Sequence, residues 1–340
     1  MRCSFRLHTL VRFGALMANS KSVPYSRQFL VDLHSLVTST ASSRWPEVTY
    51  LMNSDVAWRL PGSAPKENIR LWYDDRGIAA YAWYSPYSRC EFDLRSDDLF
   101  DSTIFSEIIN WFETRSYEFP AAYPWLLELK SIKEWEDALA DGLMMRPFDK
   151  RVLQVSVLDG DDNRKQALQK LGYEPTEHFS YCLSRSLLEP IETAPLPEGF
   201  SIRSVGPSDF EERVAVHRDA WFKSSFTLEQ YQQVRLIDIF EPELDLIAEN
   251  EQGQFGSYCV GWIDRALGVG SFEPVGTRPE FRRLGLGKAV NFEGLRRLKN
   301  MGAHSAIIGT AGFNDRAREL YTSCGFELKD RNRTWIKLLE

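Results

Sequence analysis

The segment 282–288 reads Arg282-Arg283-Leu284-Gly285-Leu286-Gly287-Lys288, and it says more about the fold than any other part of the chain. It follows a strand-like stretch, Ser271 to Thr277, and then Pro279, and it runs directly into a helical pattern. Two glycines two positions apart let the backbone approach a ligand, with N–H groups exposed where a helix begins. Such a turn favours a phosphate or pyrophosphate, because the helix dipole adds to the attraction of the N–H groups.

The common nucleotide loops have a different spacing. A P-loop needs Ser or Thr after Gly-Lys, where this chain has Ala289, and the dinucleotide fingerprint needs a third glycine, where it has Val290. What remains is Arg-x-x-Gly-x-Gly between a strand and a helix. Taken alone, this short motif is equally compatible with a tight strand-to-helix turn whose arginines are solvated.

The sequence after the loop predicts a regular order of elements. An apolar stripe from Val290 to Met301 indicates a helix ended by Gly302, and residues 306–309 indicate a buried strand. A second helix is expected to start at Asn314 and to end at Gly325, with an apolar face at Ala317, Leu320, Tyr321 and Cys324. Residues 326–328 and 334–338 are predicted to form two separate closing strands.

This order resembles the core of the GNAT acetyltransferase superfamily, from its acetyl-CoA pyrophosphate loop to its end. Two motifs carry the resemblance: Arg-x-x-Gly-x-Gly at 282–287 and Asn-x-x-Ala-x-x-Leu-Tyr-x-x-x-Gly-Phe at 314–326. It covers residues 200–340 and implies an α/β (α+β) fold, with a mixed, mostly antiparallel sheet flanked by helices.

The chain of 340 residues is long enough for two domains. Residues 189–199 contain three prolines and are predicted to be a linker between domains at 25–188 and 200–340. Residues 1–24 are basic, with no acidic residue before Asp32, and are expected to be a disordered extension; Met17 is an alternative start.

The two parts of the chain look like copies of each other. Residues 161–172 can be laid on 314–325 with a constant offset of 153, and 151–158 then falls on the strand at 304–311. The first copy has no Arg-x-x-Gly-x-Gly between Tyr123 and Arg146, and Leu168 stands where the second has Tyr321. We therefore interpret 25–188 as a degenerate GNAT-like domain that supports a catalytic domain at 200–340.

This tandem layout is similar to mycothiol synthase and its relatives within the GNAT superfamily. The runs 217–221, 242–246 and 272–276 also resemble that group. Seven of the ten tryptophans lie in the first half, where they serve either core and interdomain packing or an apolar wall for a substrate.

The resemblance implies direct attack of an amine on the acetyl thioester of acetyl-CoA. Backbone groups of residues 282–288 would hold the pyrophosphate, and Val275, Gly276 and Thr277 would hydrogen-bond the pantetheine arm. The N–H of Val275 would face the thioester oxygen. Tyr321 would be the general acid for the leaving thiolate, although helical spacing alone also fits a half-buried structural tyrosine.

Glu273 is the candidate base, because burial beside the pantetheine strand would raise its pKa towards working pH. A solvated Glu273 is the alternative, and His217 is the rival base. Asn314 would contact the pantetheine, cap its own helix, or do both.

Composition excludes several classes of function. The net charge of −7 argues against a general nucleic-acid or anionic-membrane binder. Five scattered cysteines and five histidines indicate neither a disulfide framework nor a metal site, which favours the cytoplasm.

The sequence therefore predicts an N-acetyltransferase, active as a monomer or homodimer, that uses acetyl-CoA and a small-molecule amine without a metal. The rival hypothesis is a non-catalytic acyl-CoA-binding regulatory module.

Overall fold

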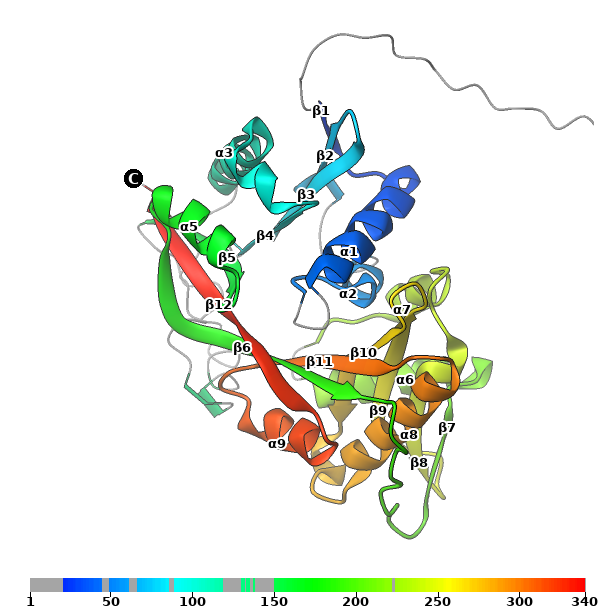
Figure 1. Ribbon diagram of the computed structural model, residues 1–340. Coiled ribbons are helices and arrows are strands. Elements are labelled where there is room, and N and C mark those ends of the chain that lie inside the picture. Colours follow the sequence, from blue (N-terminus) through cyan, green and yellow to red (C-terminus); the bar gives the residue numbers. More distant parts are fainter. Residues whose placement is uncertain are drawn as a thin grey trace, which may run out of the picture.

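Twelve strands of the described chain form one continuous sheet (Figure 1). The computed structural model describes residues 21–44, 49–60, 66–85, 89–118, 130–131, 133–134, 137, 150–221 and 224–339. The strand order is β1-β2-β3-β4-β5-β12-β6-β11-β10-β9-β8-β7. Among these neighbours, β4–β5 and β10–β11 are parallel and the other pairs are antiparallel. The prediction of a mixed, mostly antiparallel sheet flanked by helices is confirmed.

The elements of the first half are, in chain order, β1 (Lys21–Pro24), α1 (Leu30–Arg44), α2 (Asn53–Arg59), β2 (Ile69–Asp74), β3 (Gly77–Ser85), β4 (Arg89–Leu94), α3 (Thr103–Tyr117), β5 (Arg151–Leu158), α5 (Asp162–Lys170) and β6 (Glu174–Ser186). Those of the second half are β7 (Phe200–Ser204), α6 (Phe210–Ala220), α7 (Leu228–Arg235), β8 (Asp245–Asn250), β9 (Phe255–Asp264), β10 (Val269–Thr277), α8 (Leu286–Asn300), β11 (Ser305–Ala311), α9 (Asp315–Ser323) and β12 (Glu327–Leu339).

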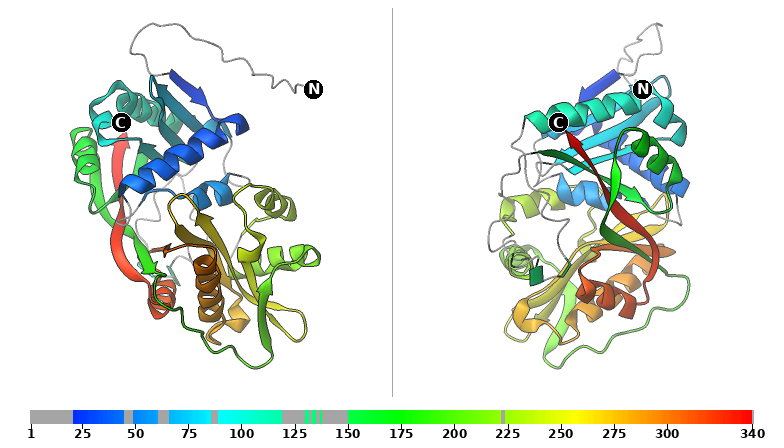
Figure 2. Two further views of the ribbon diagram at one scale, coloured as in Figure 1. Left: turned by 45° about the vertical axis from the view of Figure 1, so that its right-hand side comes forward. Right: turned by 90° about the vertical axis from the view of Figure 1, so that its left-hand side faces the viewer.

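The final strand of each half completes the sheet of the other half. Strand β12 lies between β5 and β6, and β6 in turn pairs with β11. In Figures 1 and 2 these two long strands run side by side between the halves. The predicted linker at 189–199 therefore separates two stretches of chain that share one sheet.

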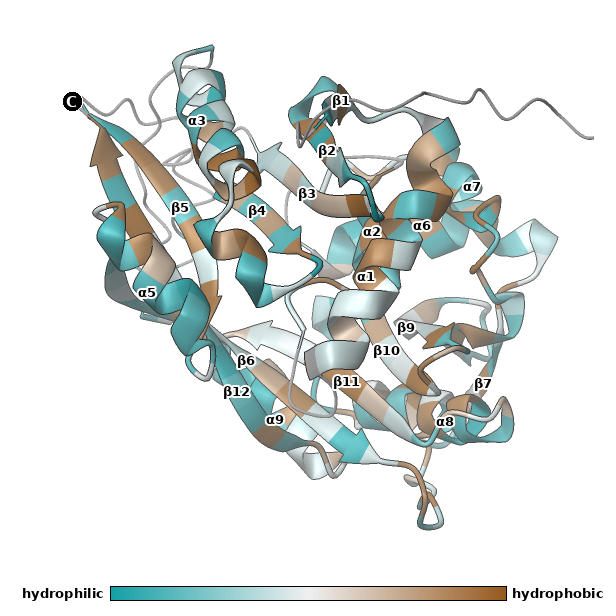
Figure 3. Ribbon diagram, turned by 45° about the horizontal axis from the view of Figure 1, so that its top comes forward, coloured by the Kyte–Doolittle hydropathy of each residue, from teal (hydrophilic) through white to brown (hydrophobic). Residues whose placement is uncertain are grey.

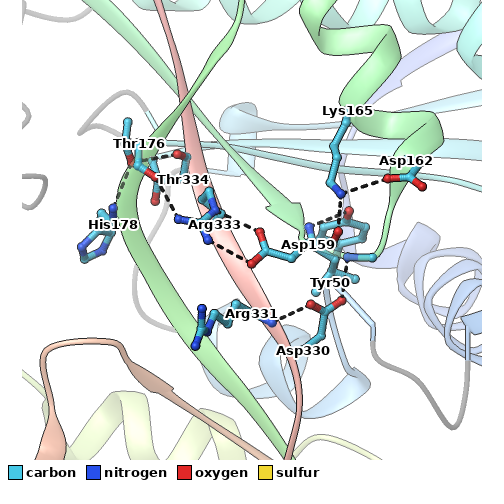
Figure 4. A network of polar contacts seen from close by, with 12 residues as sticks. Tyr50, Asp159, Asp162, Lys165, Thr176, His178, Asp330, Arg331, Arg333 and Thr334 are labelled. Atoms are coloured by element: carbon cyan, nitrogen blue, oxygen red, sulfur yellow. Dashed lines mark hydrogen bonds and ion pairs between the residues drawn. The ribbon is translucent and has the colours of Figure 1, made fainter.

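An ion pair across the exchanged strands supports this arrangement. Arg333 of β12 donates to both carboxylate oxygens of Asp159, just after β5, at 2.9 and 3.0 Å. Asp330 accepts a hydrogen bond of 3.1 Å from the Gly160 N–H, and the Asp159 N–H donates to the Arg331 carbonyl at 2.9 Å (Figure 4). Polar residues of β12 thus join the end of the chain to the first half.

The prediction of two closing strands was wrong, because β12 runs unbroken from Glu327 to Leu339. No glycine or proline lies between the two predicted strands to start a turn. Instead, the pairing of β12 with β6 is irregular at 328–330 and at 333–335. The strand therefore continues through the polar residues that interrupt its apolar pattern.

The start of the described chain also differs from prediction. Lys21–Pro24, the last residues of the predicted extension, form β1 and pair with β2. The rest of the extension, 1–20, lies outside the described residues, as does most of the stretch from Tyr123 to Arg146.

The duplication inferred from the sequence is visible in matching elements. Helices α5 and α9 begin in the same way: Asp161 accepts from the Arg164 N–H at 3.0 Å, and Asn314 accepts from the Ala317 N–H at 3.1 Å. Strands β5 and β11 precede these helices at the predicted offset. Each half therefore repeats the order strand, capped helix, long strand.

The second half has helices on both faces of its sheet. Helix α8 covers one face, where the ring of Phe272 lies against Gly294, so that a Cβ at Gly294 would meet the ring at 2.5 Å. Helix α6 covers the other, where a hydrogen bond of 2.7 Å joins His217 to Tyr258. Brown, hydrophobic stretches follow the strands in Figure 3, whereas α5 is mostly teal.

Described tryptophans of the first half serve packing. Trp72 and Trp83 are fully buried in the first half's cores. Trp58 of α2 packs across the junction, with its ring centroid 5.6 Å from that of His217 and 4.9 Å from that of Phe226. Trp45, Trp125 and Trp135 lie outside the described residues.

Candidate functional site

An opening forms where β10 leaves β11. The two strands pair at Val269, Gly270 and Ser271 only, while β11 continues to Ala311 along β6. On its other edge β10 stays with β9, through an irregularity between Phe272 and Val275. Beyond Ser271, the β11-facing edge of β10 therefore has no strand partner within the described chain. This edge can pair with an extended ligand as a neighbouring strand would.

The glycine loop closes one end of this opening. Arg283 and Gly285 have φ values of 69° and 88°, and Gly285 is the N-cap of α8. No hydrogen bond joins the N–H groups of residues 283–288 to another described residue. Consecutive unpaired N–H groups at the start of a 15-residue helix form a site for an anion. The loop residues fit a pyrophosphate.

Gly287 and Arg282 fix the loop against the end of β10. A Cβ on Gly287 would lie 3.3 Å from the Thr277 hydroxyl and 3.4 Å from Leu320, so a larger residue would crowd the turn. Arg282 donates at 3.3 Å to the Thr277 carbonyl and at 3.4 Å to the Ala220 carbonyl. The predicted residues Val275, Gly276, Thr277 and 282–288 thus come together at one end of the opening.

Glu273 lies at the irregularity of β10. Its carbonyl accepts a hydrogen bond of 2.7 Å from the Trp262 indole, which fixes the backbone at this point. Burial, with a smaller contribution from the charge of Asp55, raises the pKa of Glu273 to about 7, while Arg59 acts in the opposite direction. A carboxylate with this pKa can accept a proton near neutral pH. Glu273 is half-buried, which lies between the buried and the solvated alternatives.

Tyr321 of α9 is 7% exposed and belongs to the apolar core of the second half. Its ring packs edge-on against Phe326, with centroids 6.2 Å apart. Burial and the nearby charge of Glu273 raise the pKa of its hydroxyl above the ordinary value, so this group keeps its proton at neutral pH. The structure places Tyr321 and Glu273 within electrostatic reach of each other.

His217 is enclosed by aromatic rings behind the site. Trp58, Trp221, Phe226 and Tyr258 lie within ring-contact distance of it, with centroids 4.7 to 6.3 Å away. Burial, followed by the charges of Arg213 and Arg218, lowers its pKa to about 3. It is therefore neutral and weakly basic at pH 7, and the geometry favours Glu273 as the base.

Asn314 caps α9 through its side-chain oxygen, as described above. Of its two predicted roles, capping of α9 is the one that the contacts within the chain show.

The first half has the same opening, but an arginine fills it. Strands β4 and β5 pair only at Arg89 and Cys90 before they diverge. Beyond that point Arg164 donates to the Phe92 carbonyl of β4 at 2.9 Å and to the Ser156 carbonyl of β5 at 3.3 Å. Arg164 is 1% exposed, with its guanidinium carbon 3.6 Å from the centroid of the Tyr50 ring. Its guanidinium thus occupies the place that is open in the second half.

Sequence reasoning missed Arg164. A signal was present, since the offset of 153 places Arg164 opposite Ala317, on the helix face that is apolar in the second copy. An arginine on a helix face that is otherwise buried needs acceptors inside the fold.

No helix among the described residues has the length and apolar character needed to cross a membrane. Within the same residues, no group of three or more His, Cys, Asp or Glu side chains could bind a metal ion.

Comparison with known proteins agrees with this geometry. Residues 210–326 match the Acetyltransferase (GNAT) family. The chain is 28% identical to the mycothiol acetyltransferase of Paenarthrobacter aurescens over 46% of this chain and 51% of that protein. It is 31% identical to the one of Saccharomonospora viridis over 39% and 47%. The chain thus spans about half the length of the curated relatives it matches.

Solved structures match over nearly the whole chain. A tandem GNAT protein from the clavulanic acid biosynthesis pathway has a TM-score of 0.60 at 13% identity and covers 94% of this chain and 98% of its own. A GCN5-related N-acetyltransferase from Sphaerobacter thermophilus has a TM-score of 0.58 at 16% identity, covering 94% and 95%. Residues 210–326 therefore match the GNAT acetyltransferase family, and the chain as a whole shares the fold of a tandem GNAT protein.

Proposed function

We propose that the second half is an acetyl-CoA-dependent N-acetyltransferase, which moves the acetyl group to a primary amine by direct attack in a ternary complex. The observation that carries the proposal is the position of Glu273 and Tyr321. They come from β10 and α9 and influence each other electrostatically, one able to accept a proton near pH 7 and the other keeping its proton.

The loop supplies cofactor binding in this proposal. The N–H groups of residues 283–288 hold the pyrophosphate, aided by the dipole of α8 and the positive charges of Arg282, Arg283 and Lys288. The open edge of Val275, Gly276 and Thr277 hydrogen-bonds the pantetheine arm in place of a strand. Acetyl-CoA, when bound, supplies an activated thioester.

Proton transfer is divided between two side chains. The amine nitrogen forms a bond to the acetyl carbon as the bond from that carbon to sulfur breaks. Glu273 takes the proton released by the amine, directly or through water, and Tyr321 gives its proton to the departing sulfur. The N–H of Val275 faces the acetyl oxygen, where a well-placed donor contributes roughly 3 kcal/mol.

The acceptor class follows from the relatives. The curated matches are named mycothiol acetyltransferases, so amines related to mycothiol are the first acceptors to test, followed by other small primary amines. Helix α2 of the first half reaches β10, where the Ser271 hydroxyl donates to the Ser54 hydroxyl at 2.8 Å. An acceptor there approaches Glu273 from the side of the first half.

The test is acetyl transfer from acetyl-CoA to a panel of primary amines. The release of the free thiol of CoA is measured, and the acetamide product is identified by mass spectrometry. The proposal expects transfer by the wild type and much slower transfer by Tyr321→Phe. Acetyl-CoA binding without transfer to any amine would favour the non-catalytic acyl-CoA-binding module instead.

A further inference from the structure

Two glutamates occupy equivalent positions in the two halves. Arg89 of β4 pairs with Gln154 of β5, and Ser271 of β10 pairs with Ile307 of β11. Since Gln154 and Ile307 are related by the offset of 153, Arg89 corresponds to Ser271. Two residues further along the strands, Glu91 therefore corresponds to Glu273.

The surroundings of these glutamates drive their proton affinities apart. Burial alone would raise the pKa of Glu91, but Arg59 and Arg89 outweigh it and lower the pKa to about 2. Arg59 binds both oxygens of Glu91, at 2.7 and 2.9 Å, and Arg89 adds a contact of 3.0 Å. Glu91 is thus a permanent anion, whereas Glu273 gains and loses its proton near neutrality.

Helix α2 of the first half connects the two sites. It is fixed to β10 by the buried Ser54–Ser271 hydrogen bond and to the end of β9 by Asn53, which donates to Asp264 at 3.1 Å. Asp55 and Arg59, one turn apart on this helix, line a cavity of about 80 Å³ together with Glu91. The charges of the same two residues act on Glu273.

Arg59 is held firmly in this place. Besides its two bonds to Glu91, its guanidinium lies 4.5 Å from the centroid of the Trp83 ring. The Glu91 side chain is 9% exposed and that of Arg59 is 25% exposed, so the pair is partly shielded from water. A cation fixed in such a place acts on its neighbours more strongly than a mobile surface one.

We propose that the Arg59–Glu91 ion pair of the first half is a positioning pair for Glu273, holding beside it the cation that eases loss of its proton. The inference rests on the proposed function for its catalytic meaning. It gives the degenerate half a defined role, in which the glutamate equivalent to Glu273 anchors the cation that tunes Glu273 itself.

The charged and titratable groups facing Glu273 come from three elements. Helix α2 supplies Asp55 and Arg59, β9 supplies Tyr258, and α9 supplies Tyr321. Tyr258 and Tyr321 both have pKa values raised by burial and are neutral at pH 7. Asp55 and Arg59 therefore remain as the two opposed charges, one disfavouring and one favouring the ionised form of Glu273.

The experiment titrates Glu273 directly. Protein labelled with ¹³C at the glutamate carboxyl carbon is followed by NMR from pH 4.5 to 9, and the Glu273 resonance is identified by its absence in Glu273→Gln. The double variant Arg59→Gln, Glu91→Gln removes both charges and keeps two amides of similar shape, which protects the fold. Its Glu273 midpoint should rise by about one pH unit, the lower end of the range for losing a close opposite charge.

Three further variants separate charge from structure. Asp55→Asn should lower the midpoint by a similar amount. A general loss of packing around Glu273 would not produce shifts of opposite direction in the two variants. Glu91→Gln alone keeps the charge of Arg59 but removes its anchor, and should raise the midpoint by less than the double variant does. Arg95→Gln breaks a different ion pair of the first half, with Asp74, and should leave it unchanged.

A wild-type midpoint in the double variant, or no rise at all in Glu91→Gln alone, would overturn the inference. The proposed function fails by a different result, full turnover in Glu273→Gln, and the NMR titration does not depend on turnover.

Discussion

The carboxylate of Glu273 and the hydroxyl of Tyr321 lie close enough that the charge of the first raises the pKa of the second. The two groups come from β10 and α9, elements separated by a helix and a strand in the sequence, and Glu273 lies just beyond the point where β10 and β11 part. This pairing of an acceptor and a donor of protons at a strand opening is the basis of the proposed chemistry.

Tyr321→Phe should leave the fold and acetyl-CoA affinity nearly intact while slowing acetyl transfer by roughly 10²-fold, the low end for losing a positioned general acid. Phe keeps the ring that packs against Phe326, and only the hydroxyl is lost. Single-turnover rates and calorimetric binding constants measure the two effects separately.

Tyr173→Phe is the matched control, because its buried hydroxyl has no hydrogen-bond partner among the described residues and it lies in the first half. Its rate should equal that of the wild type. If Tyr321→Phe also reacted at the wild-type rate, another group would protonate the thiolate and the assignment would fail.

Acetyl-CoA should bind once per chain, and Gly285→Asp with Gly287→Asp should abolish binding. The carboxylates would face the pyrophosphate across the N–H groups that hold it, and side chains at these two positions would also strain the turn, because Gly285 has a φ of 88° and Gly287 lies close to Thr277. In the first half, Arg164 occupies the corresponding opening. Isothermal calorimetry gives both stoichiometry and affinity.

Gly253→Asp, which places the same charge in the exposed β8–β9 turn, should bind acetyl-CoA normally. Two equivalent sites in the wild type, or unweakened binding by the double variant, would contradict the assignment of the loop.

Glu273→Gln should stabilise the protein increasingly as pH rises from 4.5 to 7. The folded pKa of Glu273 is raised from 4.5 to about 7. Below pH 4.5 the group is protonated in both the folded and unfolded states, and above pH 7 it is ionised in both. Between these values the folded state resists ionisation of Glu273. By pH 7 the free energy of unfolding of the wild type has therefore fallen by roughly 3 kcal/mol.

Thermal melts of Glu273→Gln and wild type at each pH measure this gain. Glu280→Gln, an exposed substitution near the glycine loop, controls for the amide itself. A constant difference in Tm across this pH range would mean that Glu273 is not held in a site that resists its charge.

Neither half should fold by itself, because the final strand of each half pairs within the sheet of the other half. A fragment of residues 200–340 leaves one edge of β11 unpaired and removes both partners of β12. Circular dichroism and NMR of fragments 21–199 and 200–340 should show poor order in each alone and a folded complex on mixing. Cooperative, native-like melting of 200–340 alone would show that the exchange is dispensable.

The sequence carried the local features of the second half. The glycine loop, the cap at Asn314 and the helix ends at Gly302 and Gly325 depend on short patterns, and the structure shows them where predicted. The family resemblance supplied the type of sheet, which is mixed and mostly antiparallel. Glu273 and Tyr321 could be selected for the same reason, since each lies beside a recognisable motif.

The strand exchange could not be predicted from the chain, because local pattern does not say which copy a strand will join. β6 and β12 have similar lengths, and each fits the place of the other. The filling of the first opening by Arg164 and the reach of α2 to β10 are also long-range contacts. The first contact joins residues that are 72 positions apart in the sequence, and the second joins residues that are 217 positions apart. No periodic pattern in the sequence links positions so distant.

The central claim, that Glu273 is the base of an acetyltransferase, is tested most directly by the pH dependence of acetyl transfer in wild type and Glu273→Gln. Only the ionised carboxylate accepts the amine proton, so wild-type kcat/KM should fall as pH drops below about 7, the pKa of this group. Glu273→Gln should retain acetyl-CoA binding, turn over at least roughly 10²-fold more slowly and lose this acidic limb. Unchanged turnover with the same acidic limb in Glu273→Gln would contradict the account.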